Sequence, residues 1–493
     1  MSLRLNNLVV THGGKVLVET AQLDFEPGRP VTIVGESGSG KSLLAHAIMG
    51  TLPANLTARG TLTVDGHSYD VSDQANRRRL WGRTMSLLPQ EPVLALDPTM
   101  RAGEQVAEGA LTFTADKRGA RRAADALLSS LGLRQATRAF PHTLSGGMAQ
   151  RVAFAAATIG GAPVLIADEP SKGLDQRARA DLAELLRSHL KGGGILLTIT
   201  HDLDLARELG GEVLVMKDAH VVEQGAAGQV LAQPVHPYTR RLLGAEPSHW
   251  RHPWMRGPLD AAEWADAEHG RQVESEGTLL VSGEGLTKSF GGQQLFSNLS
   301  FDVRAGERIA LSGPSGSGKT TLGNILLRLL PPDAGTVQHS DALKGGRLQK
   351  LYQDPALAFP ARIPLKDSLG DVVRRHRLER DRLEELMGLL GLAPELLQRR
   401  PGQISGGELQ RLAIIRSMLL EPALVFADEP TSRLDLITQE ETVRCLMEQV
   451  DRLDCALVLV THDDGLAAAV TTRSIPLGVT PPLTLPQLQV TGG

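Results

Sequence analysis

The sequence predicts an α/β protein that carries two copies of one domain. The glycine-rich string GESGSGKS at residues 35–42 recurs as GPSGSGKT at residues 313–320. Further strings follow each copy in the same order: LSGGMAQR and ISGGELQR, VLIADEP and LVFADEP, TITHD and LVTHD. Each glycine-rich string lies between a short apolar run and a helix-like segment, the order of a phosphate-binding loop. Repetition of the whole set in one order excludes a chance match.

The spacing of the motifs shows where the copies differ. The serines of the second motif, Ser145 and Ser405, have the same separation as the first acids of the third motif. Lys41 and Lys319 lie farther apart than the two serines do, so the first copy has extra residues between Lys41 and Ser145. Loops between motifs tolerate such insertions. We therefore expect a first domain at residues 1–247, a linker at 248–277, a second domain at 278–478 and a proline-rich tail at 479–493.

The composition favours a cytoplasmic protein. A formal net charge of −4 over 493 residues argues against a nucleic-acid binder, and the N-terminal residues MSLRLNN lack the pattern of an export signal. The cysteines, Cys445 and Cys455, have no CxxC spacing and fit neither a disulfide framework nor a zinc or iron–sulfur site. The longest uncharged apolar run, 152–167, is interrupted by Gly-Gly-Ala-Pro and is too short to span a membrane.

The glycine-rich strings are candidate polyphosphate sites. In the first copy, a β-branched run at 30–34 predicts a buried strand, and a helix is expected from Ser42 onward. A turn between them directs backbone N–H groups and a helix N-terminus at one point, which suits phosphate. Lys41 would reach the β and γ phosphates, and the Ser42 hydroxyl would bind Mg²⁺. The candidate loop residues are Gly35, Ser37, Gly38, Ser39, Gly40, Lys41 and Ser42, and Gly313, Ser315, Gly316, Ser317, Gly318, Lys319, Thr320 and Thr321.

The apolar runs VLIADE and LVFADE each predict a strand that ends in two acids. Ligands of open α/β sheets bind at the carboxyl ends of strands. Asp168 would hold Mg²⁺, Glu169 would orient and polarise the attacking water, and His201, after the next apolar strand, would sense the γ-phosphate. A lone histidine at a strand end is usually structural, but its recurrence before an aspartate favours the functional interpretation. Asp428, Glu429 and His462 repeat the set.

Two further positions recur between these motifs. Gln90 and Gln353 follow short apolar segments, and a glutamine side chain can both coordinate Mg²⁺ and swing away; the alternative is a polar residue that opens a surface loop. Ser145 and Ser405 each open a helix, and the paired glycines after them let its N-terminus approach an anion. These helices lie far along the chain from their own loops, so a partner domain is the natural place for that anion. The glycines are Gly146, Gly147, Gly406 and Gly407.

With these motifs the chain resembles the ATP-binding cassette superfamily over nearly its whole length apart from linker and tail. The resemblance implies that each half is a P-loop cassette with a RecA-like α/β core, an antiparallel β subdomain, and a helical subdomain around 91–160 and 354–420. It also implies a head-to-tail sandwich with two composite ATP sites. One site would combine Lys41, Ser42, Gln90, Asp168, Glu169 and His201 with Ser405, Gly406 and Gly407. The other site would combine Lys319, Thr320, Gln353, Asp428, Glu429 and His462 with Ser145, Gly146 and Gly147. The resemblance also implies that Asp175 and Asp435 let the two sites sense each other.

The two copies differ at the expected adenine contact. Members of the family usually stack the base on an aromatic residue shortly before the lysine loop. Phe290 takes that place in the second copy, whereas the first copy has His12. Stacking on an aromatic side chain contributes about 1–3 kcal/mol, so we expect weaker nucleotide binding at the first site unless His12 stacks nearly as well.

The segment VHPYTRRLLGAEPS, at 235–248, indicates a subfamily. It resembles the end of ATPase subunits of peptide and nickel importers, which also share the segments that follow Gln90 and Gln353. This similarity implies two integral permease subunits that dock near the glutamines, an extracytoplasmic binding protein, and a location at the cytoplasmic face of the bacterial inner membrane. The second copy lacks the segment. The cargo and the relative activity of the two sites cannot be read from the sequence.

The linker region and the alternatives complete the sequence evidence. Trp250, Trp254 and Trp264 cluster between the copies, and flexible tethers are poor in such residues, so we expect the linker to dock on a cassette surface.

A soluble tandem ATPase that acts on ribosomes or nucleic acid is the alternative from another class. Such proteins usually carry a basic linker or zinc-type cysteine pairs, which this chain lacks. A tandem sugar-importer ATPase is a third candidate.

Overall fold

The computed structural model describes residues 1–91, 95–111, 114, 116–252, 254, 277–291, 293–379 and 381–478. The chain divides into two compact units: Met1–Arg251 with Thr431–Val443, and the described parts of His252–Pro430 and Arg444–Gly493. The boundaries expected for the two domains and the linker remain predictions, and the proline-rich tail lies outside the described residues. Among the residues that the structure describes, no helix is both long and apolar enough to cross a membrane.

The first unit is built on one mixed sheet. The strand order is β5-β4-β1-β2-β10-β9-β3-β8-β7-β6. At one end β1, β2, β4 and β5 pair antiparallel, and at the other β9, β3, β8, β7 and β6 run parallel. The strands are β1 (Leu3–His12), β2 (Lys15–Phe25), β3 (Val31–Val34), β4 (Thr57–Val64), β5 (His67–Asp70), β6 (Met85–Leu88), β7 (Val164–Asp168), β8 (Ile195–Ile199), β9 (Glu212–Lys217) and β10 (His220–Ala226).

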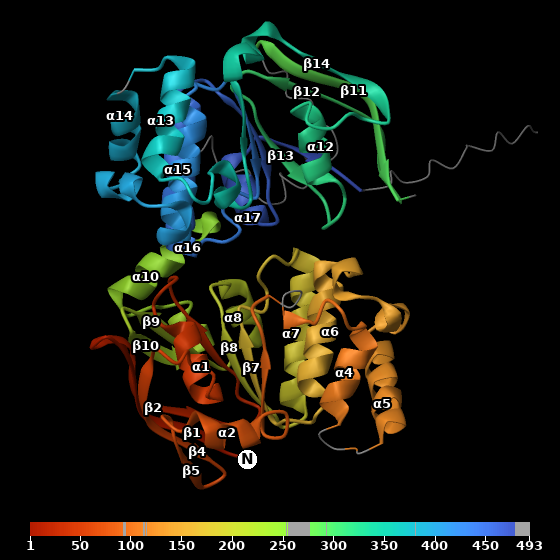
Figure 1. Cartoon of the computed structure of the whole chain (residues 1–493), viewed down its shortest axis with the longest axis vertical. Helices are drawn as coiled ribbons and strands as arrows, with labels where there is room; N and C mark the ends of the chain where they lie inside the picture. The colour runs from red at the N-terminus through yellow and green to blue at the C-terminus, as the bar shows by residue number, and fades with distance from the viewer. Residues whose placement is uncertain are drawn as a thin grey trace, which may run out of the picture. The chain divides into compact units, whose positions relative to one another are not determined.

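Helices of the first unit fall into two groups. Helices α4, α5 and α6 gather at one side of the unit, away from β1, β2, β4 and β5 (Figure 1), and they share an alanine-rich core of their own. This is the helical part that the resemblance implies. Every residue of β3, β7 and β8 is buried, as expected of parallel strands covered on both faces. The helices are α1 (Lys41–Met49), α2 (Gln74–Arg77), α4 (Ala102–Ala110), α5 (Lys117–Ser130), α6 (Gly146–Thr158), α7 (Gln176–Lys191), α8 (Leu203–Leu209), α9 (Ala227–Val230) and α10 (Pro237–Gly244).

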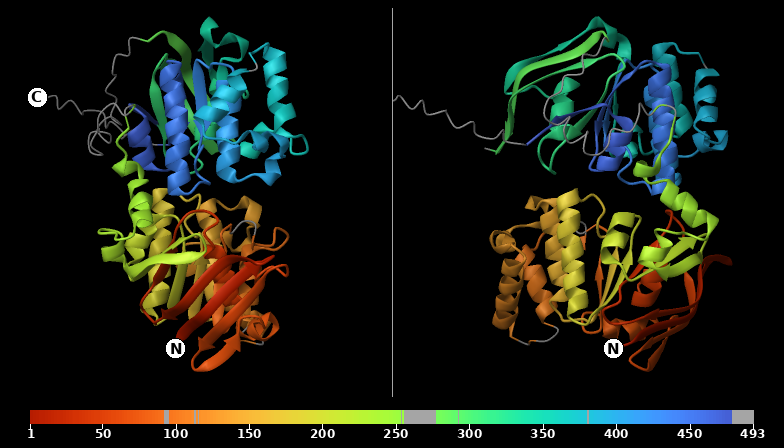
Figure 2. Two further views of the ribbon diagram at one scale, coloured as in Figure 1. Left: turned by 90° about the vertical axis from the view of Figure 1, so that its left-hand side faces the viewer. Right: turned by 180° about the vertical axis from the view of Figure 1, so that it is seen from behind.

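The second unit repeats this plan with separate sheets. A parallel sheet has the order β15-β16-β17-β13-β18, and an antiparallel sheet has the order β12-β11-β14. Figure 2 shows α13, α14 and α15 grouped away from β11, β12 and β14 within this unit, as Figure 1 does. The elements are β11 (Leu279–Phe290), β12 (Gln293–Arg304), β13 (Arg308–Ser312), α12 (Lys319–Leu326), β14 (Ala334–His339), β15 (Leu348–Leu351), α13 (Leu365–His376), α14 (Asp381–Leu389), α15 (Gly406–Met418), β16 (Leu424–Asp428), α16 (Leu436–Arg452), β17 (Ala456–Val460), α17 (Asp464–Val470) and β18 (Arg473–Pro476).

Short 3₁₀ helices connect these elements. They lie at Arg78–Leu80, Arg134–Arg138, Pro141–Thr143 and Pro247–His249 in the first unit, and at Asp341–Gly346, Pro355–Ala358, Pro394–Gln398 and Pro401–Gln403 in the second. The predicted strands and the helices that open at the glycine-rich loops and at the paired glycines are all present. The fold is therefore the doubled P-loop α/β architecture that the motifs predict.

The described tryptophans of the linker region are buried. Trp250 is 1% exposed in the first unit, where its indole N–H donates to the Ala245 carbonyl at 2.9 Å. Trp254 is 6% exposed in the second unit, and its carbonyl accepts a hydrogen bond of 2.8 Å from Arg308. Both of these tryptophans thus pack within a folded unit, and docking of the whole linker stays a prediction. Trp264 lies outside the described residues.

Alanine in place of Trp250 is expected to destabilise the first unit by about 3–5 kcal/mol, because it removes a fully buried aromatic ring. Phenylalanine keeps most of the buried area and loses only the hydrogen bond, which costs about 1 kcal/mol. Chemical denaturation, followed by far-ultraviolet circular dichroism of the backbone, measures the free energy of unfolding of both variants. Equal stability of the alanine variant and the unchanged protein would contradict the packing role.

Candidate functional site

The first glycine-rich loop is shaped by its own lysine. The Lys41 ammonium donates hydrogen bonds of 2.7 Å to the carbonyls of Gly35 and Glu36, which closes the loop around the start of α1. Burial lowers the pKa of Lys41. Glycine is required at position 35, because φ is +150° and a Cβ atom there would lie 2.2 Å from the Met216 carbonyl oxygen. A glycine-rich turn that leads into a helix N-terminus is the arrangement that phosphate sites use.

The acids at the end of β7 lie beside this loop. The Ser42 hydroxyl donates to an Asp168 carboxylate oxygen at 3.0 Å, and burial raises the pKa of Asp168. A hydroxyl and a carboxylate are hard oxygen ligands, so this pair fits Mg²⁺. Among the described residues no group of three His, Cys, Asp or Glu side chains could hold a metal. Mg²⁺ usually keeps several waters and binds through one or two carboxylates plus substrate phosphates, which matches the two protein oxygens here.

Glu169 and His201 form a close pair. His201 Nδ1 lies 2.6 Å from a Glu169 oxygen, and the His201 amide donates to the same carboxylate at 3.3 Å. Burial acts to raise the pKa of Glu169 and to lower that of His201. Their mutual attraction outweighs it, so the Glu169 pKa is lowered and the His201 pKa is raised. A carboxylate that stays ionised at the end of a buried strand can accept a proton from an attacking water.

The second unit repeats this geometry. The Lys319 ammonium donates to the carbonyls of Gly313 and Pro314 at 2.8 and 2.9 Å. The Thr320 hydroxyl donates to Asp428 at 3.0 Å, and burial raises the pKa of Asp428. His462 Nε2 lies 2.9 Å from one Glu429 oxygen, and the Gln353 amide donates to the other at 2.8 Å. Thr320, Gln353 and His462 therefore converge on the acid pair Asp428 and Glu429.

Gln90 behaves differently from Gln353. It follows β6 and is exposed, and among the described residues no hydrogen bond joins its side chain to the first acid pair. The structure thus brings one of the two predicted glutamines to its glutamate. The metal and phosphate-sensing roles of both glutamines remain predictions.

Ser145 and Ser405 cap α6 and α15. Each hydroxyl accepts a hydrogen bond of 3.3 Å from the backbone amide three residues later. Ser145 and Gly146, like Ser405 and Gly406, are exposed, so the helix N-termini are open to an anion. The structure shows each helix start where the sequence predicts it, and the ligand remains a prediction.

Asp175 and Asp435 cap the next helices. The Asp175 carboxylate accepts from the Ala178 amide at 2.9 Å, and that of Asp435 accepts from the Thr438 amide at 3.0 Å. Residues 431–443 belong to the first compact unit, and the second Asp435 oxygen accepts a hydrogen bond of 3.2 Å from the Ser37 amide. This aspartate therefore contacts the first glycine-rich loop directly.

The expected adenine contacts are exposed side chains. His12 lies at the end of β1, and its Nδ1 is 3.1 Å from the Asn55 carbonyl oxygen. Phe290, at the end of β11, is 52% exposed, with the Lys288 ammonium 5.3 Å from its ring centre. Both side chains can accept a planar base, and their role remains a prediction.

The segment at 235–248 contacts the first site, which the motif analysis did not foresee. Tyr238 on α10 packs with Val34 and Val213, and its hydroxyl accepts a hydrogen bond of 3.0 Å from the Glu36 amide in the loop. Burial raises the pKa of Tyr238. The second copy lacks this segment, and among the described residues no tyrosine hydroxyl contacts the second glycine-rich loop.

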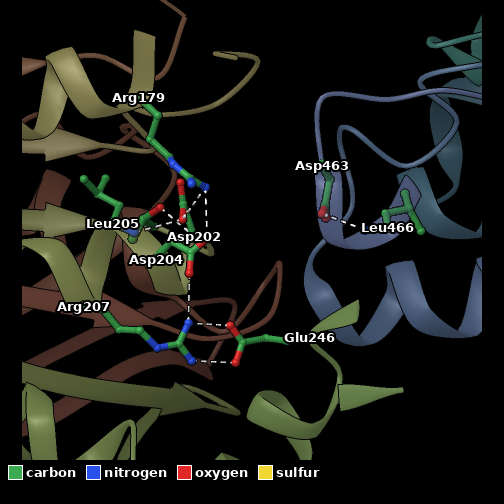
Figure 3. A network of polar contacts seen from close by, with 9 residues as sticks. Arg179, Asp202, Asp204, Leu205, Arg207, Glu246, Asp463 and Leu466 are labelled. Atoms are coloured by element: carbon green, nitrogen blue, oxygen red, sulfur yellow. Dashed lines mark hydrogen bonds and ion pairs between the residues drawn. The ribbon is translucent and has the colours of Figure 1, made fainter. Parts of the chain in front are cut away.

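An ion-pair network joins the same segment, through Glu246, to Asp202 (Figure 3). Arg207 on α8 makes two hydrogen bonds of 2.6 Å to Glu246 and one of 3.1 Å to Asp204. Arg179 on α7 lies 3.2 Å from Asp204 and 3.6 Å from Asp202, the residue after His201. The corresponding residues of the second copy include Gln439 and Ala468, although Asp463 still caps its helix through the Leu466 amide (Figure 3).

A lysine loop at a helix start, with two acids and a histidine at neighbouring strand ends, defines a P-loop nucleotide-binding protein. The chain belongs to the ABC transporter family, whose model matches residues 18–172 and 296–432. ATP-binding proteins of this family hydrolyse ATP, and the chain is accordingly an ATPase.

Two curated relatives match most of the chain. The uncharacterized ABC transporter ATP-binding protein YejF of Escherichia coli K12 is 33% identical over 475 residues, which cover 91% of this chain and 88% of the relative. The glutathione import ATP-binding protein GsiA of Salmonella typhi is 33% identical over 521 residues, which cover 95% and 83%. The expected superfamily and its import-type relatives are thus confirmed.

Solved structures support the fold. The RNase-L Inhibitor matches with a TM-score of 0.63 at 22% identity, covering 95% of this chain and 87% of that one. A model of ribosome-bound archaeal Pelota and ABCE1 matches with a TM-score of 0.65 at 22% identity, covering 95% and 76%. At this identity the likeness establishes the tandem cassette fold alone.

Proposed function

We propose that this chain is the ATP-hydrolysing subunit of a membrane importer of the peptide and nickel class, located at the cytoplasmic face of the membrane. The observation that carries the proposal is the presence of a complete hydrolytic set in each unit: a loop lysine, a metal-side acid, a glutamate and a histidine. Relatives named for glutathione import and the docked 235–248 segment support import. The cargo would be selected by the binding protein and permeases.

In each proposed site the chain binds ATP and prepares a water molecule. Lys41 and Lys319 would bind the phosphates, and Glu169 and Glu429 would take a proton from the water. Their histidines hold these carboxylates in place. Mg²⁺, held beside Ser42 and Asp168 or Thr320 and Asp428, would neutralise charge on the phosphates.

We also propose that each ATP site is completed by the opposite copy. The exposed helix starts at Ser145 and Ser405 would bind the phosphates of the other copy's nucleotide. The long separation in sequence between each of these helices and the glycine-rich loop of its own copy supports this pairing. ATP binding would then join the copies, and hydrolysis would release them, as in a two-state switch.

A groove in the second unit is suited to a permease helix. It has a volume of about 690 Å³ and lies between the segment after Gln353, α13 and the end of α15. Leu357 in its lining is 70% exposed, and Asp371, Arg375 and Arg416 place charges around it. An exposed leucine inside a charged groove is a typical docking site for an amphipathic helix.

Aspartate in place of Leu357 is expected to abolish binding of the permeases while leaving ATP binding intact, because it puts a charge where an apolar helix face would bury. Leu389→Asp is the matched control, since Leu389 is 50% exposed on α14 and does not line the groove. Co-purification from membranes measures both. Equal recovery of permeases with both variants would place the docking site elsewhere.

Tyrosine in place of His12 is expected to tighten ATP binding at the first site. A larger aromatic face adds stacking energy of about 1 kcal/mol, which corresponds to roughly fivefold in affinity. A titration with a fluorescent ATP analogue in a Lys319→Ala background, which reports the first site, measures the effect. An unchanged dissociation constant would mean that the histidine already stacks as well or that the base binds elsewhere.

The test of the whole proposal is mass spectrometry of the proteins that a tagged chain retains from gently solubilised membranes, alongside its ATPase rate. Two permeases and an extracytoplasmic binding protein are expected, and the ligand of that binding protein would identify the cargo. Permeases of the sugar-importer type would favour a tandem sugar-importer ATPase. Ribosomal proteins or nucleic acid in place of permeases would support the alternative of a soluble tandem ATPase and overturn the transport function.

A further inference from the structure

Lys350 on β15 contacts the metal-side acid of the second site. Its ammonium lies 3.6 Å from one oxygen of Asp428, while the other oxygen accepts the hydrogen bond from Thr320. Both oxygens of the carboxylate therefore already have a protein partner. The two side chains are 12% and 9% exposed, so water screens their attraction poorly.

The position of Lys350 is fixed by its neighbours. Its ammonium donates a hydrogen bond of 2.9 Å to the Asn324 side-chain carbonyl on α12. It also lies 5.1 Å from the ring centre of Tyr352 and 5.8 Å from that of Phe426. A lysine held by an amide, a carboxylate and two aromatic rings is a built feature of this site rather than a mobile surface charge.

The first site lacks this lysine. Leu87 precedes Gln90 by the same number of residues as Lys350 precedes Gln353, and Leu87 packs against the apolar core. His46 takes the place of Asn324 and contacts the Thr51 hydroxyl at 2.7 Å. In the part of the chain that the structure describes, no Lys or Arg side chain forms an ion pair with Asp168. The two metal-side acids thus differ in their charge surroundings.

We propose that the Lys350 ammonium weakens divalent-cation binding at the second site, so that this site binds nucleotide with little dependence on Mg²⁺ whereas the first site requires it. The inference rests on the proposed role of both loops as ATP sites. The Lys350 ammonium beside Asp428 cancels the charge of that carboxylate and repels a divalent metal ion. A unit positive charge at this range, partly shielded from water, lowers affinity for a divalent ion by about tenfold or more.

The quantity to measure is the ratio of nucleotide dissociation constants in EDTA and in Mg²⁺, obtained by titration with a fluorescent ATP analogue. Lys41→Ala chains report the second site and Lys319→Ala chains report the first. We expect the ratio to be about tenfold smaller at the second site than at the first. Lys350→Met should raise it to the value of the first site, and Leu87→Lys should lower it at the first site.

Lys344→Met is the matched control, because Lys344 precedes the same strand, is 75% exposed and pairs with Asp341 on the surface. Thermal unfolding of each variant identifies a loss of folding, and Lys350→Gln replaces the methionine variant if that variant fails to fold. If the folded Lys350 variants still bind nucleotide but their ratio of dissociation constants is unchanged, the inference is overturned. Absence of nucleotide binding at either site under both conditions would instead overturn the proposed function, and the inference with it.

Discussion

Glutamine in place of both Glu169 and Glu429 is expected to lower the rate of ATP hydrolysis by at least about a hundredfold, because a carboxamide cannot accept the proton of the attacking water. Both glutamates have left-handed backbone, with φ of 47° and 46°. The Glu169 amide donates to the Ile199 carbonyl at 2.7 Å, and the Glu429 amide donates to that of Val460 at 2.9 Å. The main chain thus fixes each side chain at the strand end, so glutamine keeps the geometry and removes only the basicity.

Phosphate release and nucleotide binding must be measured together. Binding should remain within about threefold, because the loop lysines and the Ser42 and Thr320 hydroxyls are unchanged. Glu184→Gln, on the exposed face of α7, is the matched control for the loss of one charge. A double variant that binds ATP and hydrolyses it at the original rate would show that another group activates the water.

The local parts of each site could be predicted from the sequence. Strand, glycine loop and helix are adjacent in the chain, so the periodicity around Lys41 and Lys319 predicts their geometry. The acids follow directly from buried apolar runs, and all parallel strands present their carboxyl ends at one sheet edge. This explains why Glu169 and His201, which are distant in sequence, meet as predicted.

Contacts that depend on particular side chains could not be predicted in this way. Tyr238 reaches the Glu36 amide from a segment recognised only by resemblance, and Lys350 resembles any polar residue within a short strand. Arg179 and Arg207, which pair with Asp204 and Glu246, belong to no motif. A charged residue in sequence is more often solvated than paired, so its partner is known only once the helices are packed.

Among the residues that the structure describes, each of several contacts around the two sites occurs in one copy. The first loop has the Tyr238 hydrogen bond, and the segment that supplies it is joined to α8 by Arg207 and Glu246. The second site has Lys350 and the Gln353 to Glu429 hydrogen bond. The motifs are duplicated while their surroundings have diverged, so the two sites should differ in affinity and metal dependence although their reacting groups match.

Alanine in place of Lys41 or Lys319 is expected to remove one of two bound nucleotides, and the double variant should bind none at micromolar concentration. Each ammonium is held by two loop carbonyls at the point where phosphates would bind. Loss of a hydrogen bond to a charged group costs about 1.5–3 kcal/mol, or roughly ten- to a hundredfold in affinity. Isothermal titration gives the stoichiometry, with the exposed Lys191→Ala as control. Two bound nucleotides in the double variant would contradict the assignment of the loops.

The single-lysine backgrounds also separate the two possible pairings of loop and helix. In a Lys319→Ala chain only the first loop binds ATP, and a head-to-tail arrangement requires Ser405, not Ser145, to complete that site. Arginine at position 405 should therefore weaken ATP binding there by about tenfold, because it blocks the open N-terminus of α15. Arginine at position 145 blocks the matching N-terminus of α6 and should have no effect. If the change at position 145 weakens binding and the change at position 405 has no effect, each loop is completed by its own copy.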